Sequence, residues 1–521
     1  MNRKVIGALV IMSMGVLMVV AWKFAKPLLK ERAEIQSSDA KQLKGKLKVA
    51  VDSWIGYFPL VSSEMKNGMR IAGWSLECED DKADYATRMK RLRDGEFQFV
   101  VATVDSYILN AVPVNFPGLI VAVIDESRGG DAILARKSVV DNINAIKGKT
   151  NLRVAFTPGS PSHHLLKVTA AHFDVREILP VGEGRIETNG STEALNKLMT
   201  SKADIAVVWE PDVSKGLANG DIVKILGTEK TQKVIVDILV VNKDFAKRNP
   251  EAVETLLSTY FRTLKFYREQ PDKLRVEIVK TTNANHDDVD SMLKGVVWFG
   301  LMENCERWFG IAQPGVRSEN GLIETIDSTV KILQASGDFS SNPLPSSDPY
   351  RLTQSDYLEK LFSKGAAGFT TVGSGGEIDQ AGSLEAKFSQ LTEGQWNALK
   401  EVGSLKSLQI AFQSGASDLS LQGRADLDQM VETLKHYPQF RVVVKGHTGT
   451  SGDKEENKRL SQERTESVAR YLMVTYNIDQ NRLRALGMGS EQPLPKQPGE
   501  SERAYNYRLP RVEISLVSEV F

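Results

Sequence analysis

Four short segments of the sequence carry aromatic, acidic or hydroxyl side chains in positions where a small ligand could be held. Each segment directly follows a run of residues typical of a β-strand, such as LKVAVD or FQFVVATVD. In open α/β sheets, ligands bind outside the carboxyl ends of the strands. The segments therefore predict a binding cleft, and its candidate residues are Trp54, Gly56, Tyr57, Asp105, Ser160, Trp209 and Glu210.

The chemistry that these residues offer is recognition. Trp54 and Tyr57 provide flat apolar faces, and Gly56 between them lets the backbone approach a ligand closely. Ser160 precedes a predicted helix, whose free N–H groups attract anions. Each interpretation has a structural alternative: the aromatic loop covers a sheet edge, Ser160 serves only as a helix cap, and Trp209 belongs to the core. The presence of four such loops on one edge favours the cleft.

Sequence patterns typical of catalysis or of metal binding are not found. The chain has neither a Ser-His-Asp elbow nor a phosphate-binding loop, and its two cysteines, Cys78 and Cys305, are far apart. The adjacent residues His163 and His164 would diverge by about 100° on a helix and chelate a metal poorly. Lys plus Arg equals Asp plus Glu at 66 each, so no net charge attracts nucleic acid. We therefore predict a binding protein without enzymatic activity, metal or cofactor.

The elements that position the candidate residues divide the chain into several domains, since 521 residues exceed one hydrophobic core. From residue 46, strand patterns alternate with helical patterns, which predicts an α/β fold with parallel sheets in two lobes. A mainly helical stretch follows at 249–336. Glycine-rich residues 364–376 suit a flexible linker, and a helical pattern at 383–403 separates it from the last domain. That domain alternates again from a strand pattern at 407–412 onward.

The N-terminus has the composition of a membrane anchor. Residues 5–22 are apolar, and eighteen helical residues at about 1.5 Å each span roughly the hydrocarbon thickness of a bilayer. Neither a small-residue cleavage site nor a lipid-attachment cysteine follows. We therefore expect an uncleaved transmembrane helix over 1–23 and a juxtamembrane linker over 24–45. A signal peptide cleaved at another site is the alternative.

The first soluble region resembles periplasmic substrate-binding proteins for taurine, nitrate, sulfonates and pyrimidine precursors. The resemblance rests on motifs that include SWIGYFPL, TPGSPSHHLL, ADIAVVWEP and IVDILVVNK. It implies a two-lobed clamshell over 46–361 that closes around a small ligand. Lobe I would comprise about 46–133 and 242–361, and lobe II about 134–241. The resemblance also implies an ABC-type transporter as partner.

The ligand shell that this resemblance implies adds Gly130 and Asp131 to the candidates. Asp105, Asp131 and Glu210 bring negative charge to the cleft, whereas the helix start at Ser160 favours an anion. A zwitterion such as an aminosulfonate satisfies both preferences. We therefore expect a small anionic or zwitterionic ligand, similar to a sulfonate or nitrate.

The C-terminal residues 405–521 contain the segments RVVVKGHTGT and NKRLSQER, which resemble the peptidoglycan-binding signature of the OmpA-like domain family. The resemblance implies an α+β domain in which an Asp of a GHTD loop takes the ammonium of diaminopimelate and an Arg takes its carboxylate. Asn457 and Arg464 match the signature, but Gly449 occupies the position of the Asp. Half of the implied charge clamp is therefore missing.

The loss of this Asp leaves two alternatives. Either Thr448 or Asp453 replaces it and wall binding persists at lower affinity, or the domain keeps its fold as a spacer or docking unit. Thr448, Asn457 and Arg464 are the candidate peptidoglycan ligands. Together with the anchor, they predict a single-pass bacterial inner-membrane protein that lies mostly in the periplasm and grips the wall. The alternative function is an envelope scaffold or sensor without a transport role.

Overall fold

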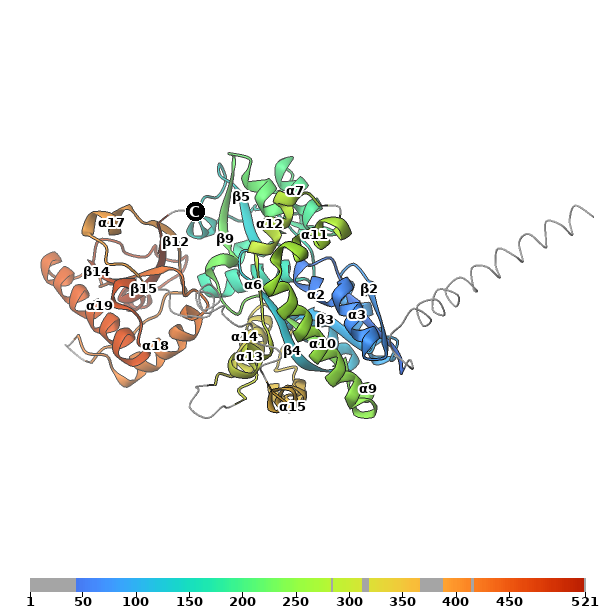
Figure 1. Cartoon of the computed structure of the whole chain (residues 1–521). Helices are drawn as coiled ribbons and strands as arrows, with labels where there is room; N and C mark the ends of the chain where they lie inside the picture. The colour runs from blue at the N-terminus through green and yellow to red at the C-terminus, as the bar shows by residue number, and fades with distance from the viewer. Residues whose placement is uncertain (1–43, 283, 312–317, 366–387, 414–416, 520–521) are drawn as a thin grey trace, which may run out of the picture.

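The computed structural model describes residues 44–282, 284–311, 318–365, 388–413 and 417–519. The predicted anchor at 1–23 and most of the predicted glycine-rich linker lie outside these ranges. None of the helices within them is both long and apolar enough to cross a membrane. These residues form two α/β lobes, of which the second is inserted into the first along the chain, and a C-terminal domain (Figure 1).

The first lobe is built on a six-stranded sheet with the order β11-β4-β10-β3-β1-β2. β1 pairs in parallel with β2 and β3, whereas β10 runs antiparallel to both of its neighbours, β3 and β4. The prediction of parallel sheets therefore fails at β10, because this strand returns from the second lobe in the opposite direction. The strands are β1 (Gly45–Val51), β2 (Trp74–Asp80), β3 (Phe99–Thr103), β4 (Gly118–Ser127), β10 (Val236–Asn242) and β11 (Val296–Trp298).

Both faces of this sheet are covered, since the central strands are continuous apolar runs and every residue of β3 is buried. Two hydrophobic clusters lie on the two faces. The first includes side chains of α3 (Ser63–Ile71), α10 (Pro250–Glu269) and α15 (Asp356–Ser363). The second includes side chains of α4 (Tyr85–Arg93), α5 (Val104–Ala111) and α14 (Gly321–Ala335).

The second lobe is a five-stranded sheet with the order β7-β6-β8-β5-β9. β5 is antiparallel to β8 and β9, whereas β6 is parallel to β7 and β8. Helices α6 (Pro161–Phe173), α7 (Ser191–Met199) and α8 (Asp212–Leu217) pack against the sheet. The strands are β5 (Asp131–Arg136), β6 (Val154–Phe156), β7 (Arg185–Glu187), β8 (Ile205–Trp209) and β9 (Ile222–Gly227).

The chain crosses between the lobes twice, through 128–130 from β4 to β5 and through 228–235 from β9 to β10. Thr228 joins the two crossings, because its hydroxyl oxygen accepts hydrogen bonds from the N–H groups of Gly129 at 2.9 Å and Asp131 at 3.1 Å. The predicted lobe limits at 133/134 and 241/242 fall within β5 and β10. Apolar strand residues on both sides give no change of composition that would mark the crossings.

The C-terminal domain has a four-stranded sheet with the order β12-β15-β13-β14. Helices α18 (Leu421–Leu434) and α19 (Lys454–Tyr476) share its hydrophobic core. The strand predicted at 407–412 forms only isolated bridges. Of the helix predicted at 383–403, the described part (388–403) contains α17 (Glu393–Ala398), and the edge strand β12 follows it. The strands are β12 (Lys400–Ser404), β13 (Arg441–His447), β14 (Leu483–Gly489) and β15 (Arg511–Ser518).

Candidate functional sites: an acidic cleft and a C-terminal surface

The aromatic loop after β1 packs onto two neighbouring segments at the junction of the lobes. The indole N–H of Trp54 donates a hydrogen bond to Oδ1 of Asp125 on β4 at 3.0 Å. A Cβ atom on Gly56 would lie 2.1 Å from Oδ2 of Asp125, and one on Gly130 would lie 2.4 Å from the Trp54 ring. Close approach therefore requires both glycines. The structure brings the predicted residues Trp54, Gly56 and Gly130 together and adds Asp125.

A pair of carboxyl groups lies beneath this loop. Asp125 and Asp237 face each other across β4 and β10, and both are buried. Burial raises the pKa of Asp125 to about 7, and burial together with the charge of Asp125 raises the pKa of Asp237 well above its ordinary value. Each carboxyl has one buried oxygen without a hydrogen-bond partner among the described residues. We therefore expect the two carboxyl groups to share a proton, which would satisfy those oxygens.

The hydroxyl of Tyr57 donates a hydrogen bond to Oδ1 of Asp237, and the side chain is buried. Burial raises the pKa of Tyr57, and the charge of Asp237 raises it further. Tyr57 therefore supports the carboxyl pair, and its polar end is already engaged.

Two predicted acids, Asp105 and Asp131, lie where the lobes meet. Asp131 accepts a hydrogen bond from Ser127 Oγ at 2.6 Å. Burial raises its pKa to about 7, and the charges of Asp105 and Glu210 add to the rise. Asp105 is only 2% exposed, and its neighbour Ser106 donates from Oγ to the carbonyl oxygen of Gly159 in the second lobe at 3.4 Å. The lobes are thus closed over these acids.

The start of helix α6 belongs to this junction from the side of the second lobe. Ser160 does not cap the helix with its side chain, because its hydroxyl donates to the carbonyl oxygen of Thr157 at 2.6 Å. Ser162 Oγ and His164 Nδ1 are buried and have no hydrogen-bond partner among the described residues. Burial lowers the pKa of His164, while the charge of Asp105 opposes that shift. The first turn therefore retains unused hydrogen-bonding capacity.

Trp209 and Glu210 occupy the end of β8 beside the first crossing. The N–H of Glu210 donates to the carbonyl oxygen of Gly130 at 2.8 Å. Its carboxylate accepts hydrogen bonds from the N–H and the hydroxyl of Ser214, at 3.1 and 2.9 Å. Trp209 donates its backbone N–H to Ser191 Oγ at 3.0 Å, and its side chain is half-buried. The predicted ligand carboxylate of Glu210 is thus already used within α8.

Acidic side chains outnumber basic ones at the junction of the lobes. The nearest buried guanidinium, that of Arg88, is fully enclosed and forms ion pairs with Asp52 at 3.2 Å and with Asp81. Asp52 in turn contributes to the raised pKa values of Asp125 and Asp237. In the described part of the chain, no three His, Cys, Asp or Glu side chains form a metal-binding group. Four polar residues of this junction, namely Asp52, Asp125, His164 and Asp237, are not among the ligand residues predicted from the sequence.

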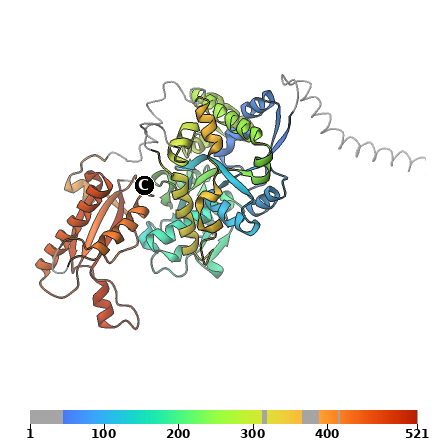
Figure 2. The same ribbon diagram turned by 90° about the horizontal axis from the view of Figure 1, so that it is seen from below.

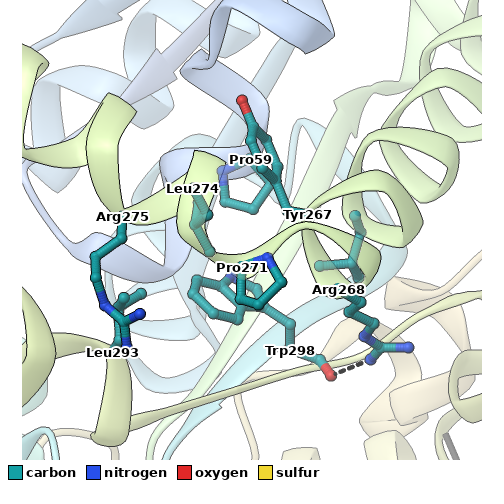
Figure 3. A pocket seen from close by; sticks show the side chains of 9 residues that line it. Pro59, Tyr267, Arg268, Pro271, Leu274, Arg275, Leu293 and Trp298 are labelled. Atoms are coloured by element: carbon teal, nitrogen blue, oxygen red, sulfur yellow. Dashed lines mark hydrogen bonds between the residues drawn. The ribbon is translucent and has the colours of Figure 1, made fainter.

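A separate cavity of about 250 Å³ is lined by Pro59, which follows the aromatic loop in the chain, and by side chains between Leu264 and Trp298 (Figure 3). Trp298 separates the two, since its indole N–H donates to the carbonyl oxygen of Gly56 at 2.7 Å. Both arginines in the wall are engaged: Arg268 donates to the carbonyl oxygen of Trp298 at 2.7 Å, and Arg275 donates to Asp290 at 2.6 Å. The remaining wall is mostly apolar and comprises Pro59, Leu264, Tyr267, Pro271, Leu274 and Leu293.

The C-terminal surface, formed by α19 and the loop between β13 and α19, contains an unusual cation, Arg464. The guanidinium of Arg464 lies 4.8 Å from the centre of the Phe412 ring, and its buried Nε has no partner among the described residues. Burial lowers the pKa of Arg464. Asp453, a predicted substitute for the missing Asp, caps helix α19 by accepting from the N–H of Glu456 at 3.0 Å. A Cβ atom on Gly449 would meet nothing within 4 Å, so the position of the motif Asp is open.

The other two predicted wall ligands form local contacts. The hydroxyl of Thr448 donates to the carbonyl oxygen of Gly449 at 3.1 Å, and the amide of Asn457 donates to the carbonyl oxygen of Ser451 at 2.9 Å. These bonds fix the loop between β13 and α19. Neither Thr448 nor Asn457 therefore replaces the carboxylate that is missing at Gly449.

Comparison with known proteins identifies the C-terminal domain. Residues 411–507 match the OmpA family, which confirms the prediction for this region. The chain is 31% identical over 102 residues to outer membrane protein Omp38 of Acinetobacter baumannii, which covers 20% of this chain and 29% of the relative. It is 28% identical over 85 residues to the peptidoglycan-associated lipoprotein of Rhizobium meliloti, which covers 16% of this chain and 48% of the relative. The chain spans less than half the length of either relative.

Solved structures similar to the chain include two binding proteins of the classes that the sequence resemblance named. The periplasmic aliphatic sulphonate binding protein of Escherichia coli has 18% identity and a TM-score of 0.41, covering 49% of this chain and 86% of that chain. The periplasmic nitrate-binding protein of Synechocystis PCC 6803 has 14% identity and a TM-score of 0.46, covering 64% of this chain and 92% of that chain. The two-lobed fold itself follows from the strand orders and the two crossings.

Proposed function

We propose that this chain is a solute-binding protein of the bacterial envelope whose two lobes close on a small zwitterion. The observation that carries the proposal is the closed junction of the lobes. There, buried acids of the first lobe meet a helix start of the second lobe, where Ser162 and His164 have polar atoms without a partner in the described part of the chain. Carboxylates attract an ammonium group, and a helix start attracts an anionic group. A compound with both groups, such as an aminosulfonate, supplies both partners.

The acids favour a zwitterion over the simple anions that the sequence resemblance also allows. A nitrate or an unsubstituted sulfonate would be repelled by the acids of the site, where burial and the charge of Asp105 already raise the pKa of Asp131. An ammonium group removes that repulsion and releases the protons held by raised pKa values. We therefore rank aminosulfonates and related zwitterions above sulfonates, and sulfonates above nitrate.

The proposal extends to the cell wall and to the membrane. The OmpA-family domain would bind peptidoglycan through Arg464, with reduced affinity because Gly449 offers no carboxylate. Residues 5–22 would anchor the chain in the inner membrane, and an ABC-type permease would receive the solute. A second candidate function, an envelope scaffold or sensor, is favoured by one observation: the C-terminal domain shares a continuous hydrophobic core with the second lobe.

A thermal-shift screen of the full-length protein tests the solute-binding function. At a ligand concentration a hundredfold above Kd, binding adds about 2.7 kcal/mol to stability, which raises Tm by a few degrees. Taurine should raise Tm more than ethanesulfonate or nitrate. Trp54→Ala should abolish the shift, whereas the control Trp396→Ala in the C-terminal domain should retain it. A shift that is equal in both variants, or absent for every compound, would contradict the proposal.

A further inference from the structure

The C-terminal domain is docked against the second lobe through its edge strand. Gly403 of β12 lies so close that a Cβ atom there would be 2.9 Å from the Phe173 ring and 3.0 Å from Ile143. Asn144 forms two bonds across the same contact: its amide donates to Glu401 Oε1 at 3.0 Å, and its carbonyl accepts from the N–H of Ser404 at 2.9 Å. The contact thus combines close packing with directed hydrogen bonds.

An aromatic cluster extends this contact below β12. Tyr437 is fully buried, packs edge to face on Phe173 with ring centres 5.4 Å apart, and hydrogen bonds with Nδ1 of His172 at 2.8 Å. His172 also stacks on His436 at 5.3 Å. Core residues of the second lobe and of the C-terminal domain belong to one hydrophobic cluster. Figure 1 and Figure 2 show the C-terminal domain beside the second lobe in both views.

The C-terminal domain also contacts the crossing 228–235, which is part of the hinge between the two lobes. Gln232 lies in the crossing 228–235; its N–H donates to the carbonyl oxygen of His436 at 2.9 Å, and its carbonyl oxygen lies 2.8 Å from His436 Nδ1. Lys230 of the same crossing donates to Ser518 Oγ at the end of β15. Because Nδ1 of His436 faces a carbonyl oxygen, it carries the proton in the neutral ring. Nε2 is then free to accept from Ser328.

The bond to Ser328 reaches the first lobe. Ser328 Oγ lies 3.0 Å from Nε2 of His436, and it belongs to α14, whose residues Leu322, Ile326 and Val330 are part of the first lobe's core. One side chain of the C-terminal domain therefore contacts the hinge and the first lobe, while its neighbours are packed on the second lobe. A rotation of one lobe against the other must break or distort some of these contacts.

We infer that the C-terminal domain clamps the hinge of the two lobes, so that its docking and the closure of the cleft are energetically coupled. Coupling of this kind is reciprocal: a load or ligand that displaces the domain opens the cleft, and a solute that closes the cleft holds the domain in place. The chain thereby gains a further function, which is to link the state of the wall-facing domain to the state of the solute site. This inference does not depend on which solute the cleft binds.

Hydrogen exchange of the full-length protein without ligand tests the coupling. Gly403→Leu should undock the domain, and Gly394→Leu is the matched control because a Cβ atom at Gly394 meets nothing within 4 Å. The amides of 103–106 and 157–160 report closure, since they carry the Ser106–Gly159 contact between the lobes. In Gly403→Leu their exchange should rise by about 5-fold to 150-fold, the usual range of coupling between sites.

Exchange that rises only in β12 and at 143–146, with 103–106 and 157–160 as in the control, would overturn the inference. Ser328→Ala provides a second test, because it removes the contact with the first lobe without altering the C-terminal domain itself. If exchange in Gly403→Leu also rises in β13 and β15, the substitution has unfolded the C-terminal domain, and the result for Ser328→Ala then decides whether the domain clamps the hinge. A rise at 103–106 and 157–160 supports the clamp, and unchanged exchange there refutes it.

Discussion

The acidic cleft and the C-terminal surface differ in the balance of their charges. In the cleft, buried carboxyl groups exceed the available cations, and the excess is compensated by raised pKa values and by Arg88. On the C-terminal surface, Arg464 has no carboxylate partner among the described residues, and its guanidinium lies over the Phe412 ring. On the proposed function, the cleft would therefore take a positive charge from its ligand, whereas the C-terminal surface would take a negative one. The two regions of one chain are expected to select ligands of different charge.

Removal of Arg88 gives the largest effect, because it breaks the compensation on the acidic side of this comparison. The guanidinium is fully enclosed between Asp52 and Asp81 and also donates to the carbonyl oxygen of Val101 at 2.7 Å. Arg88→Met leaves the carboxylates of Asp52 and Asp81 without their shared cation, and we expect a loss of about 3–5 kcal/mol in the free energy of unfolding. Urea unfolding measures the loss. The exposed Arg93, varied to Met, is the control, and equal effects of the two substitutions would contradict this assignment.

Restoration of the missing Asp at position 449 tests the charge balance of the C-terminal surface. Gly449→Asp places a carboxylate in open space, so affinity for isolated peptidoglycan should rise by about 2 kcal/mol, the lower end of what such a pair loses when one partner is removed. Co-sedimentation with isolated peptidoglycan measures the change. Gly449→Asn has the same size without the charge and should leave the affinity unchanged. A similar gain for both variants would show that size, rather than charge, limits binding.

A methyl group at Gly56 tests how tightly the cleft is assembled. Its Cβ would overlap with the carboxylate of Asp125, and we expect Gly56→Ala to cost about 1–3 kcal/mol in stability, as is typical of overpacking. Gly220→Ala, where a Cβ meets nothing within 4 Å, is the control. Thermal unfolding of both variants measures the difference. If Gly56→Ala is as stable as the control, the loop does not rest on Asp125.

Local patterns predicted the loops of the cleft but not the groups beneath them. Trp54, Gly56 and Gly130 were candidates because they follow strands or match a motif, and the structure places them in contact. Asp125 and Asp237 escaped notice because each lies within an apolar strand, where alternation draws attention to the neighbouring apolar residues. An acid in a continuous apolar run is itself informative, since buried charges require a partner or a proton.

Long-range contacts account for the rest of what the sequence could not show. The sequence allows Asp453 to be either a wall ligand or a helix cap, and only the position of the Glu456 N–H distinguishes the two roles. The docking of β12 depends on Gly403 meeting residues more than two hundred positions away. Such a pairing leaves no periodicity or spacing in the sequence, which is why the region before 405 was interpreted as linker and helix.

Acidification should give the smallest effect, at the junction that joins the two regions. Burial lowers the pKa of His436, so the docked state binds fewer protons than the undocked state. Docking is then fully present above the ordinary histidine pKa of about 6.5 and weakens as the pH falls below it. Protonation of His436 also places a positive charge beside the ring of His172, which stacks on it. The titratable groups that face His436 are His164, His172, Lys233 and Glu432, and the Tyr437 hydroxyl bonds to His172.

Hydrogen exchange of 228–235 at about pH 5.5 and about pH 7.5, one unit on either side of the ordinary value, measures this effect. Each rate is divided by the intrinsic exchange rate of that amide at the same pH, and these corrected rates are compared; the exposed-site control His286→Gln should keep the wild-type response. The wild-type hinge should exchange faster at the lower pH, and His436→Gln should remove much of that difference. A pH response that persists in full in His436→Gln would place the titrating group elsewhere, and the hinge would then be held independently of this imidazole.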